Sequence, residues 1–560
     1  MSRTIPLALL ALAAFAAGVV TAAGSGKDEG VVRFGDAWER GDFDAMYAEL
    51  SPGAKDDYDA ETFKAAYEQA AVTATMTAVA TDKVRGPLDQ GGDEVVALPV
   101  DATTTAFGTV SGEIAVPIDG DGRIEWRPDL VFPGLTEGAK LKRETRVAER
   151  APILAADRSP LASGPVDARS YHGAGGIVAG EVGTPKGERA EQMKREGFPP
   201  GALGGISGLE LAFDSTLAGT PGGKLVAKGP DGSTVLAQTE PTPGEPVRTT
   251  IDPDLQEATA AALGDTYGGA AVIDAKSGDV LGLAGLAFSA PQPPGSTFKV
   301  ITAAASLEEG ITKPSEEFPV VSSAPVGGRE ISNAHDELCG GTLVESFAMS
   351  CNTVFAPLGE ELGGKRLVDY AEKFGFNSPP SLYNADSLAL TDPPPSTIPP
   401  DLADDVAGVS AIGQGEVLAS PLEMASVSQT IANEGVRSPT SMVKDPELAG
   451  DYPDVTAVSP ETAKQVRDMM IEVVNSGTGI AAAVPGVTVA GKTGTAELGT
   501  VSDEQPIGAE EPEQDVDAWF TAFAPAENPK LAVAVMVIKA PGDGGTVAAP
   551  IAQQILAAGL

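Results

Sequence analysis

The chain has 560 residues, 42% of them hydrophobic, which is too long for one hydrophobic core and typical of a globular rather than a disordered protein. Its 79 acidic residues outnumber 38 basic ones, and the formal charge of −41 repels phosphate backbones. We therefore expect no nucleic-acid partner. With only two histidines and two cysteines, and no familiar zinc-ligand spacing among them, we also expect no metal in its chemistry.

The N-terminal segment is apolar. Residues 5–23 carry no charge and follow Arg3. A run of this length is about long enough to cross a bilayer and longer than the core of an ordinary signal peptide. The alternative is a cleaved signal peptide, with Val20, Thr21 and Ala22 at the cleavage site. Either interpretation places the rest of the chain outside the cytoplasm.

Three segments of different pattern follow. Between residues 31 and 67 apolar residues recur at helical spacing, and from about Thr73 they alternate, with Asp-Gly pairs at 119–122 that predict turns. This predicts a small α+β domain. A glycine-rich stretch then ends in the linker-like "TEPTPGEP". The remaining 247–560 mixes helices and strands, includes two predicted strands around a turn in 268–285, and is large enough to hold an enzyme core.

Three short motifs occur in order within this last segment. They are serine-x-x-lysine, serine-x-asparagine and lysine-threonine-glycine, formed by Ser296 and Lys299, by Ser350 and Asn352, and by Lys492, Thr493 and Gly494, with Thr495 next. Taken singly, each has an ordinary structural explanation, as a helix N-cap, a helix end and a solvated strand residue. Three motifs in order, each in a suitable context, indicate a catalytic serine with a lysine base.

Two other stretches match single motifs. Ser441 and Lys444 repeat the first spacing, but Pro446 is expected to stop any helix from following. Lys276, Ser277 and Gly278 resemble the third motif but precede Ser296 and lie at a predicted turn. Ser296 instead opens an apolar helical pattern, whose N-terminus favours negative charge on an attacked oxygen. We therefore assign the motifs to Ser296, Ser350 and Lys492.

This order of motifs is the signature of penicillin-binding proteins and serine β-lactamases. Nearly the whole chain resembles class B penicillin-binding proteins, through "WRPDLVFPGL", "ERAPILAADRSPLA", "SGLELAFDSTLAGTPG", "TIDPDLQEA" and "AIGQGEVLASPLEMA". The N-terminal α+β domain resembles the nuclear-transport-factor-like domain of the methicillin-resistance subclass. One departure is "GLAGLAFSAPQPPGS", which is shorter before Pro-Gly-Ser than the family pattern and lacks its Asn-Arg-Ala segment.

The resemblance implies a multidomain α+β and α/β architecture. Its parts would be a membrane anchor or signal segment (1–25), a cone-shaped nuclear-transport-factor-like α+β domain (26–138), an elongated β-rich pedestal of the dimerisation type (139–246), and a transpeptidase domain with an antiparallel sheet flanked by helices (247–560). Too few residues precede 140 for a glycosyltransferase domain, so we expect a monofunctional protein.

The resemblance also implies the chemistry. Ser296 would attack the D-alanyl-D-alanine end of a peptidoglycan stem peptide, with Lys299 as the base, and β-lactams would acylate the same serine. A neutral Lys299 is needed, and burial and the like charge of Lys492 would lower its pKa. The other roles carried over are proton transfer by Ser350, substrate binding by Asn352, Lys492, Thr493, Gly494 and Thr495, and an oxyanion hole of the Ser296 and Thr495 backbone N–H groups. No cofactor is implied.

Several alternatives stay open. A serine β-lactamase or a D,D-carboxypeptidase would share the nucleophile, but the deacylating Glu-x-x-x-Asn of class A β-lactamases has only an imperfect counterpart in Glu372 and Asn377. A non-catalytic β-lactam sensor or a septal scaffold is a rival of another class. The partners implied are stem peptides, β-lactams and a membrane glycan polymerase or other division or elongation proteins, at the cell membrane with the catalytic part outside.

Two local features carry separate expectations. Cys339 and Cys351 flank one predicted helix, and either a disulfide or two free buried thiols fits an exported chain. Residues 502–517 are strongly acidic, which predicts a solvated loop that ends at the core residues Trp519 and Phe520.

Overall fold

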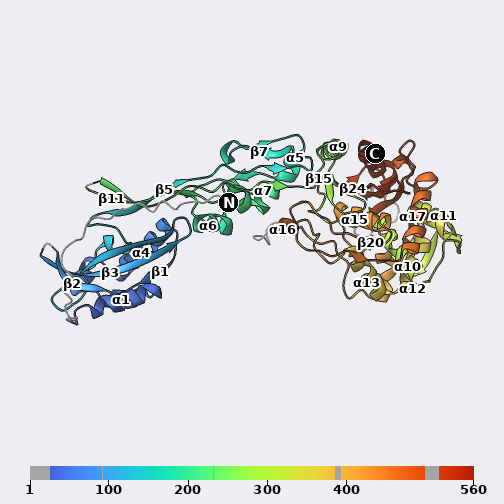
Figure 1. Cartoon of the computed structure of the whole chain (residues 1–560). Coiled ribbons are helices and arrows are strands. Elements are labelled where there is room, and N and C mark those ends of the chain that lie inside the picture. The colour runs from blue at the N-terminus through green and yellow to red at the C-terminus, as the bar shows by residue number, and fades with distance from the viewer. Residues whose placement is uncertain (1–25, 91, 231, 385–392, 498–515) are drawn as a thin grey trace, which may run out of the picture. The chain divides into compact units, whose positions relative to one another are not determined.

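The computed structural model describes residues 26–90, 92–230, 232–384, 393–497 and 516–560 (Figure 1). The predicted anchor and nearly all of the acidic segment lie outside these ranges. Within them, no helix is long and apolar enough to cross a membrane. The chain forms two compact units: unit 1 comprises the residues up to Ala148, Lys186–Pro200 and Thr220–Thr242, and unit 2 comprises Glu149–Pro185, Gly201–Gly219 and Pro243–Leu560.

Unit 1 begins with four helices followed by an antiparallel sheet, coloured blue in Figure 1. The helices are α1 (Glu29–Glu39), α2 (Phe43–Ala48), α3 (Pro52–Asp57) and α4 (Ala60–Ala74), and the strands are β1 (Met76–Thr81), β2 (Arg85–Gln90), β3 (Asp93–Thr104) and β4 (Gly108–Pro117). Asp42, Ser51 and Asp59 accept backbone N–H bonds at the starts of α2, α3 and α4, which is why these helices begin there.

Alternation along β3 produces the core of this α+β part. Val96, Leu98 and Val100 are buried in one cluster with Phe34 and Phe63 from the helices, because alternate strand residues face the same side. The Asp-Gly pairs at 119–122 form the predicted turn, which joins the bridged residues Ile118 and Ile124 rather than two long strands. The helices-then-sheet order agrees with the sequence analysis.

Residues 139–246 contribute to both units. In unit 1 they form the sheet β12-β11-β5 and one helix, with bounds β5 (Lys140–Arg146), α6 (Gly187–Arg195), β11 (Gly222–Gly229) and β12 (Gly232–Thr239). In unit 2 they form short elements: β6 (Ile153–Leu154), β7 (Pro160–Ser163), β8 (Ser170–Tyr171), α5 (Gly175–Ala179), β9 (Val182–Gly183), β10 (Gly204–Gly205), α7 (Gly208–Ala212) and α8 (Asp214–Ala218). Buried carboxylates of Glu210 and Asp214 accept from Arg150 at 2.7 and 2.6 Å and hold these short elements together.

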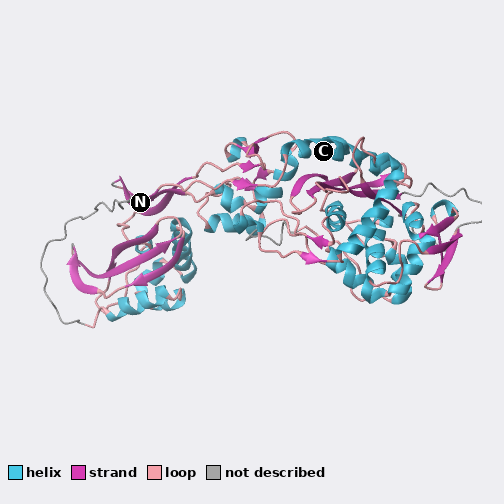
Figure 2. Cartoon of the chain, turned by 45° about the vertical axis from the view of Figure 1, so that its right-hand side comes forward, coloured by secondary structure: helices cyan, strands magenta, loops and turns pink. Residues whose placement is uncertain are grey.

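The largest sheet lies in unit 2 and is antiparallel throughout, in the order β15-β14-β24-β23-β22. Its strands are β14 (Gly268–Asp274), β15 (Val280–Gly285), β22 (Ala490–Glu497), β23 (Val516–Ala524) and β24 (Leu531–Ala540). The two strands predicted around a turn in 268–285 are β14 and β15. Figure 2 shows this sheet with helices on both sides.

Alternation again explains how helices cover both faces. Val533 and Val535 of β24 are buried in one cluster with Ile555, whereas Ala534 and Met536 are buried in another with Met424. The first face is covered by α9 (Pro253–Leu263) and α18 (Ala549–Gly559), and the second by α15 (Pro421–Ala432) and α17 (Pro460–Asn475). α10 (Lys299–Glu308) packs against these two helices. The predicted antiparallel sheet flanked by helices is therefore present.

Unit 2 has further strands and α-helices. They are β13 (Val247–Arg248), β16 (Glu317–Val321), β17 (Ser323–Val326), β18 (Arg329–Ser332), β19 (Cys339–Thr342), α11 (Leu343–Ala348), α12 (Asn352–Leu362), α13 (Gly364–Phe374), α14 (Asp404–Ala411), β20 (Val436–Arg437), α16 (Pro446–Ala449) and β21 (Val455–Thr456). The expectation that Pro446 prevents a following helix is wrong, because Pro446 is the first residue of α16. A first helical position needs no backbone donor, so proline is tolerated there.

Candidate active site

Ser296 lies in a short 3-10 turn, η3 (Gly295–Phe298), directly before α10. Neither η3 nor α10 has a side-chain cap, so the helix-cap explanation for this serine is wrong. Among the described residues its hydroxyl makes no hydrogen bond, and the residue is half-buried. The hydroxyl is therefore free to face a ligand.

Close backbone contacts explain the glycines around this turn. Gly295 has φ +52°, and a Cβ there would lie 2.5 Å from the Thr495 carbonyl oxygen of β22. On the other side the Gly295 N–H donates to the Gly413 carbonyl at 3.0 Å, and a Cβ on Gly413 would meet the Gly295 oxygen at 2.0 Å. The turn thus packs closely between β22 and the loop after α14. Only glycine fits at Gly295 and at Gly413, because a Cβ at either position would clash with backbone.

Lys299, the first residue of α10, is completely buried. Its Nζ donates to the Ser350 carbonyl and to Asn352 Oδ1, both at 2.7 Å, and lies 3.4 Å from Ser350 Oγ. Burial lowers the pKa of Lys299 well below its ordinary value, and the nearby charge of Lys492 lowers this pKa further. Both causes are those expected from the sequence, and they favour the neutral amine that a base requires.

Ser350 occupies the link between α11 and α12 with φ +63°, a left-handed conformation that is uncommon for serine. The Lys492 Nζ donates to its hydroxyl at 2.9 Å. Because the Lys299 Nζ lies 3.4 Å from the same oxygen, Ser350 Oγ stands between two buried amines. A proton can pass between Lys299 and Ser350 over this short path.

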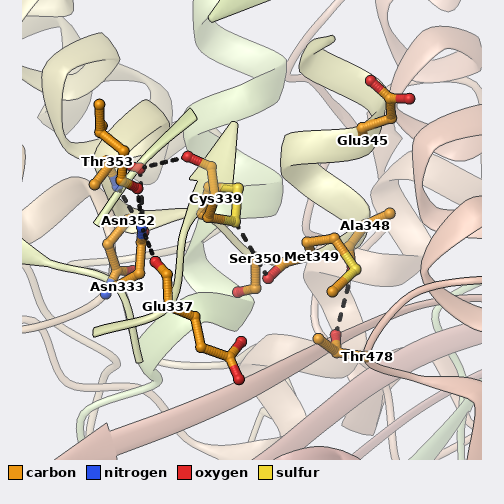
Figure 3. The surroundings of a disulfide bond; sticks show 12 residues. Asn333, Glu337, Cys339, Glu345, Ala348, Met349, Ser350, Asn352, Thr353 and Thr478 are labelled. Atoms are coloured by element: carbon orange, nitrogen blue, oxygen red, sulfur yellow. Dashed lines mark hydrogen bonds between the residues drawn. A yellow bond between two sulfur atoms is a disulfide. The ribbon is translucent and has the colours of Figure 1, made fainter. Parts of the chain in front are cut away.

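The two cysteines are bridged. Cys339 of β19 and Cys351, the residue between Ser350 and Asn352, form a disulfide with their Cα atoms 5.4 Å apart (Figure 3). This decides between the two arrangements that the sequence left open. The Cys339 sulfur also lies 4.0 Å from the Met349 carbonyl oxygen, but a bridged sulfur has no proton to donate. The disulfide therefore joins the second motif covalently to β19.

β22 carries the third motif. Lys492 is fully buried, and desolvation lowers its pKa to about 7. Gly494 packs against η3, since a Cβ there would lie 2.6 Å from the Pro294 carbonyl oxygen. β22 is an edge strand, and among the described residues it pairs with β23 alone. Its second edge can accept an extended peptide as an added strand.

The two threonines of β22 bond to segments that the sequence analysis did not single out. Thr493 Oγ1 lies 2.5 Å from Thr478 Oγ1, and Thr478 also bonds to the Ala348 carbonyl at the end of α11. Thr495 Oγ1 accepts the Gly544 N–H at 3.4 Å. No local sequence signal marks Thr478 or Gly544, because each is brought to β22 only by the fold. Gly413 was within a quoted segment but was not named.

The candidate residues outside the three motifs have structural contacts. Glu372 and Asn377 hydrogen-bond to each other at 3.2 Å, and Asn377 also accepts from the Ile398 N–H, with no bond to any motif residue among those described. His172 lies 2.8 Å from the Ser163 hydroxyl. Trp519 and Phe520 are fully buried in the sheet, as predicted for core residues.

A free serine hydroxyl, a buried lysine of lowered pKa one turn on, a second serine between two amines and an open strand edge define a serine acyl-transfer enzyme. Comparison with known families is more specific. The penicillin-binding protein transpeptidase domain model matches residues 268–557, more than half of the chain. The penicillin-binding protein dimerisation domain matches 151–249, and the NTF2-like N-terminal transpeptidase domain matches 28–139. The chain belongs to the penicillin-binding protein transpeptidase family.

Individual relatives agree with this assignment. The Mycobacterium tuberculosis (strain CDC 1551 / Oshkosh) protein named peptidoglycan D,D-transpeptidase PbpA is 37% identical over 294 residues, which cover 49% of this chain and 56% of that protein. The chain thus matches little more than half the length of this relative. The structure of M. tuberculosis penicillin-binding protein 3 complexed with ampicillin is 27% identical, with a TM-score of 0.58, covering 74% of this chain and 95% of that one. The ceftriaxone acyl-enzyme of M. tuberculosis penicillin-binding protein A is 27% identical, with a TM-score of 0.57 and coverage of 74% and 98%.

Proposed function

We propose that this protein is a peptidoglycan D,D-transpeptidase that cross-links stem peptides through an acyl-enzyme on Ser296. The observation that carries the proposal is the chain of contacts from Lys299 through Ser350 to Lys492 beside the Ser296 turn. A relative named as a D,D-transpeptidase and a relative solved as a ceftriaxone acyl-enzyme support the same chemistry.

In the first half-reaction the Ser296 hydroxyl attacks the carbonyl carbon of the penultimate D-alanine. Its proton moves to the neutral Lys299 Nζ as the new ester bond forms. The peptide bond to the terminal D-alanine then breaks, and Ser350 passes a proton to the leaving amine. The backbone N–H groups of Ser296 and Thr495 would stabilise the oxyanion, and the contact between Gly295 and Thr495 supports their closeness.

In the second half-reaction the amine of another stem peptide attacks the ester carbonyl carbon and forms the cross-linking amide bond. The ester bond to Ser296 breaks, and the proton lost by the amine passes through Lys299 to the Ser296 oxygen. In the first half-reaction Asn352, Lys492, Thr493, Gly494 and Thr495 would bind the donor peptide, with the threonines and Lys492 on the carboxylate of its terminal D-alanine. β-Lactams would acylate the same serine, as the ampicillin complex of the similar penicillin-binding protein 3 supports. A membrane glycan polymerase or other division or elongation proteins are the proposed partners.

We further propose the domain division 26–138, 139–246 and 247–560, which lies close to the ranges that the three family models match. The proposed location is the cell membrane, with residues 1–25 as a single-pass anchor or signal and the catalytic part outside the cell. The disulfide supports the outer location, because such bonds form in oxidising compartments.

Labelling with fluorescent penicillin tests the nucleophile. We expect one labelled peptide that contains Ser296, retention of label in Ser441→Ala, and loss in Ser296→Ala, because only Ser296 has a buried lysine beside it. Label on another residue would refute the assignment.

Incubation with a stem-pentapeptide substrate and an amine acceptor separates the remaining candidates. A transpeptidase forms the cross-linked product and keeps the penicillin label for a long time. Release of D-alanine without a cross-link would favour a carboxypeptidase, and rapid loss of the label would favour a β-lactamase. Labelling without any peptide turnover would favour a sensor or scaffold.

A further inference from the structure

Residues 317–342, here called the arm, contain β16 to β19 and lie next to the second motif. They form two separate two-stranded sheets, β16 with β19 and β17 with β18, which are not part of the five-stranded sheet. Two-stranded sheets are marginal on their own. The arm therefore depends on its contacts with the rest of unit 2, which include α11, α12, α14 and the second motif.

Asn333 is the centre of these contacts. Its side chain is buried, with Nδ2 donating to the Val321 and Glu337 carbonyls at 2.9 and 3.0 Å. Its Oδ1 accepts both the N–H and the hydroxyl of Thr353 at 3.1 Å (Figure 3). The Nδ2 bonds thus hold the arm together, and the Oδ1 bonds join it to the first turn of α12.

The bond to Thr353 replaces a missing helix cap. Cys351 is the N-cap residue of α12, but its side chain makes no cap hydrogen bond because its sulfur is bridged to Cys339. The first N–H groups of a helix need acceptors from outside it. Asn333, twenty residues earlier, supplies one of them.

The residue before Asn333 sets the orientation of a motif side chain. The Ser332 carbonyl accepts Asn352 Nδ2 at 2.9 Å, so the other amide atom, Oδ1, faces Lys299 at 2.7 Å. An Asn side chain that turned over would present a donor to the Lys299 amine instead of an acceptor. Within the part of the chain that the structure describes, the groups near Lys299 Nζ besides Asn352 include Ser350, the Phe355 ring and the ionisable Lys492.

We propose that Asn333 is a positioning residue for the reaction: by capping α12 and fixing Ser332, it holds Asn352 with its oxygen toward Lys299. It touches neither substrate nor Ser296 and acts through Asn352. The proposal rests on the proposed function for its catalytic readout, but the capping step can be measured without any activity.

The test compares Asn333→Ala with Asn433→Ala in the full chain. Asn433 is a matched control, because its amide also bonds to a backbone carbonyl, that of Val436, and contacts no motif residue. Fluorescent-penicillin acylation is measured from pH 5 to 9 at saturating drug, with the rate normalised to the titrated fraction of active sites. Hydrogen exchange is measured on the peptide that contains Thr353.

For Asn333→Ala we expect a plateau rate at least about tenfold lower, since Lys299 loses its fixed orientation. The acid limb of the pH profile, where the rate rises with pH as Lys299 loses its proton, should move to lower pH by about half a unit. The reason is that Asn352 Oδ1 no longer accepts a hydrogen bond from the Lys299 ammonium, which lowers the pKa of Lys299. Exchange at Thr353 should quicken at least about tenfold. The Asn433→Ala protein should keep the wild-type plateau rate, the wild-type position of the acid limb and the wild-type exchange rate at Thr353, even if its melting temperature falls.

Thr353→Val and Thr353→Ser keep the test valid if Asn333→Ala fails to fold. Thr353→Val loses the hydroxyl bond to Asn333, so its plateau acylation rate and its acid limb should both move in the direction expected for Asn333→Ala. Thr353→Ser keeps the hydroxyl and should match the wild-type protein. Unchanged Thr353 exchange in a folded Asn333→Ala protein, or a limb that moves to higher pH, overturns the proposal. A wild-type chain that penicillin does not acylate refutes the proposed function instead, and Thr353 exchange then decides the capping step alone.

Discussion

Lys299 and Lys492 approach one hydroxyl, that of Ser350, from two different elements. Both amines are completely buried, and desolvation is the largest cause of the lowered pKa of each. Burial of a charge without a counter-charge is unfavourable, so both sites favour neutral amines. Both amines are therefore placed to exchange protons with Ser350.

Lys492→Gln tests this electrostatic coupling. Acylation requires neutral Lys299, so the rate rises as the pH increases through the pKa of Lys299. Below pH 7 Lys492 is charged and lowers that pKa; its removal should raise it and move the acid limb up by about half a unit. The measurement is the pH profile of penicillin acylation, with the exposed Lys276→Gln as control. If the acid limb of the acylation profile does not move, Lys492 is neutral over the whole pH range in which Lys299 titrates.

At the scale of elements, the link between α11 and α12 has to hold an unfavourable conformation at Ser350. The Cys351 N–H bonds back to the Ser346 carbonyl at 2.9 Å, and the disulfide joins the same residue to β19. Asn333 then fixes the first turn of α12. Three independent restraints therefore surround the second motif, which explains how a left-handed serine is maintained.

The double variant Cys339→Ala, Cys351→Ala measures the covalent restraint. Closing a loop of this size lowers the entropy of the unfolded chain, so we expect the free energy of unfolding of unit 2 to fall by about 3 kcal/mol. Acylation should stay within about threefold of wild type, because Asn333 still caps α12. Alkylation of the native, unreduced protein should modify no thiol; two modified thiols there would contradict the bridge.

At the scale of the molecule, the two units have separate cores. The cluster that contains Phe34, Phe63 and Trp126 draws all its buried residues from unit 1, whereas the clusters around the five-stranded sheet are formed within unit 2. Separate cores allow separate cooperative transitions.

We therefore expect two thermal unfolding transitions. Penicillin acylation should raise the midpoint temperature of the unit 2 transition alone. Acylation stabilises the unit that binds the drug and leaves the other unchanged. Tryptophan fluorescence separates them, because Trp38 and Trp126 lie in unit 1 and Trp519 is buried in unit 2. A Trp38→Phe, Trp126→Phe variant should report only the transition shifted by the drug. A single transition, or a shift of both, would show that the units unfold together.

Local patterns in the sequence were sufficient for several features. Helical spacing between residues 31 and 67 predicted the first helices of unit 1, alternation from about Thr73 predicted the strands after them, and 268–285 was predicted as the two strands β14 and β15. The three motifs pointed to Ser296, Ser350 and Lys492. These features depend on residues near one another in the chain, so periodicity and spacing reveal them. The local rule for Pro446 failed because the same residue that ends one helix can begin another.

By itself, the sequence determined the order of elements, the family resemblance and the identity of the motif residues, because each of these is written in short runs of the chain. Only the tertiary structure decided that Ser296 caps no helix, that Cys339 and Cys351 are bridged, that Asn333 caps α12, that Gly413 contacts the Ser296 turn, and that Thr478 and Gly544 contact β22. The physical reason is that these contacts join residues from 12 to 118 positions apart. Burial and close backbone approach arise only when those segments pack together, and they leave no periodic signal in the chain.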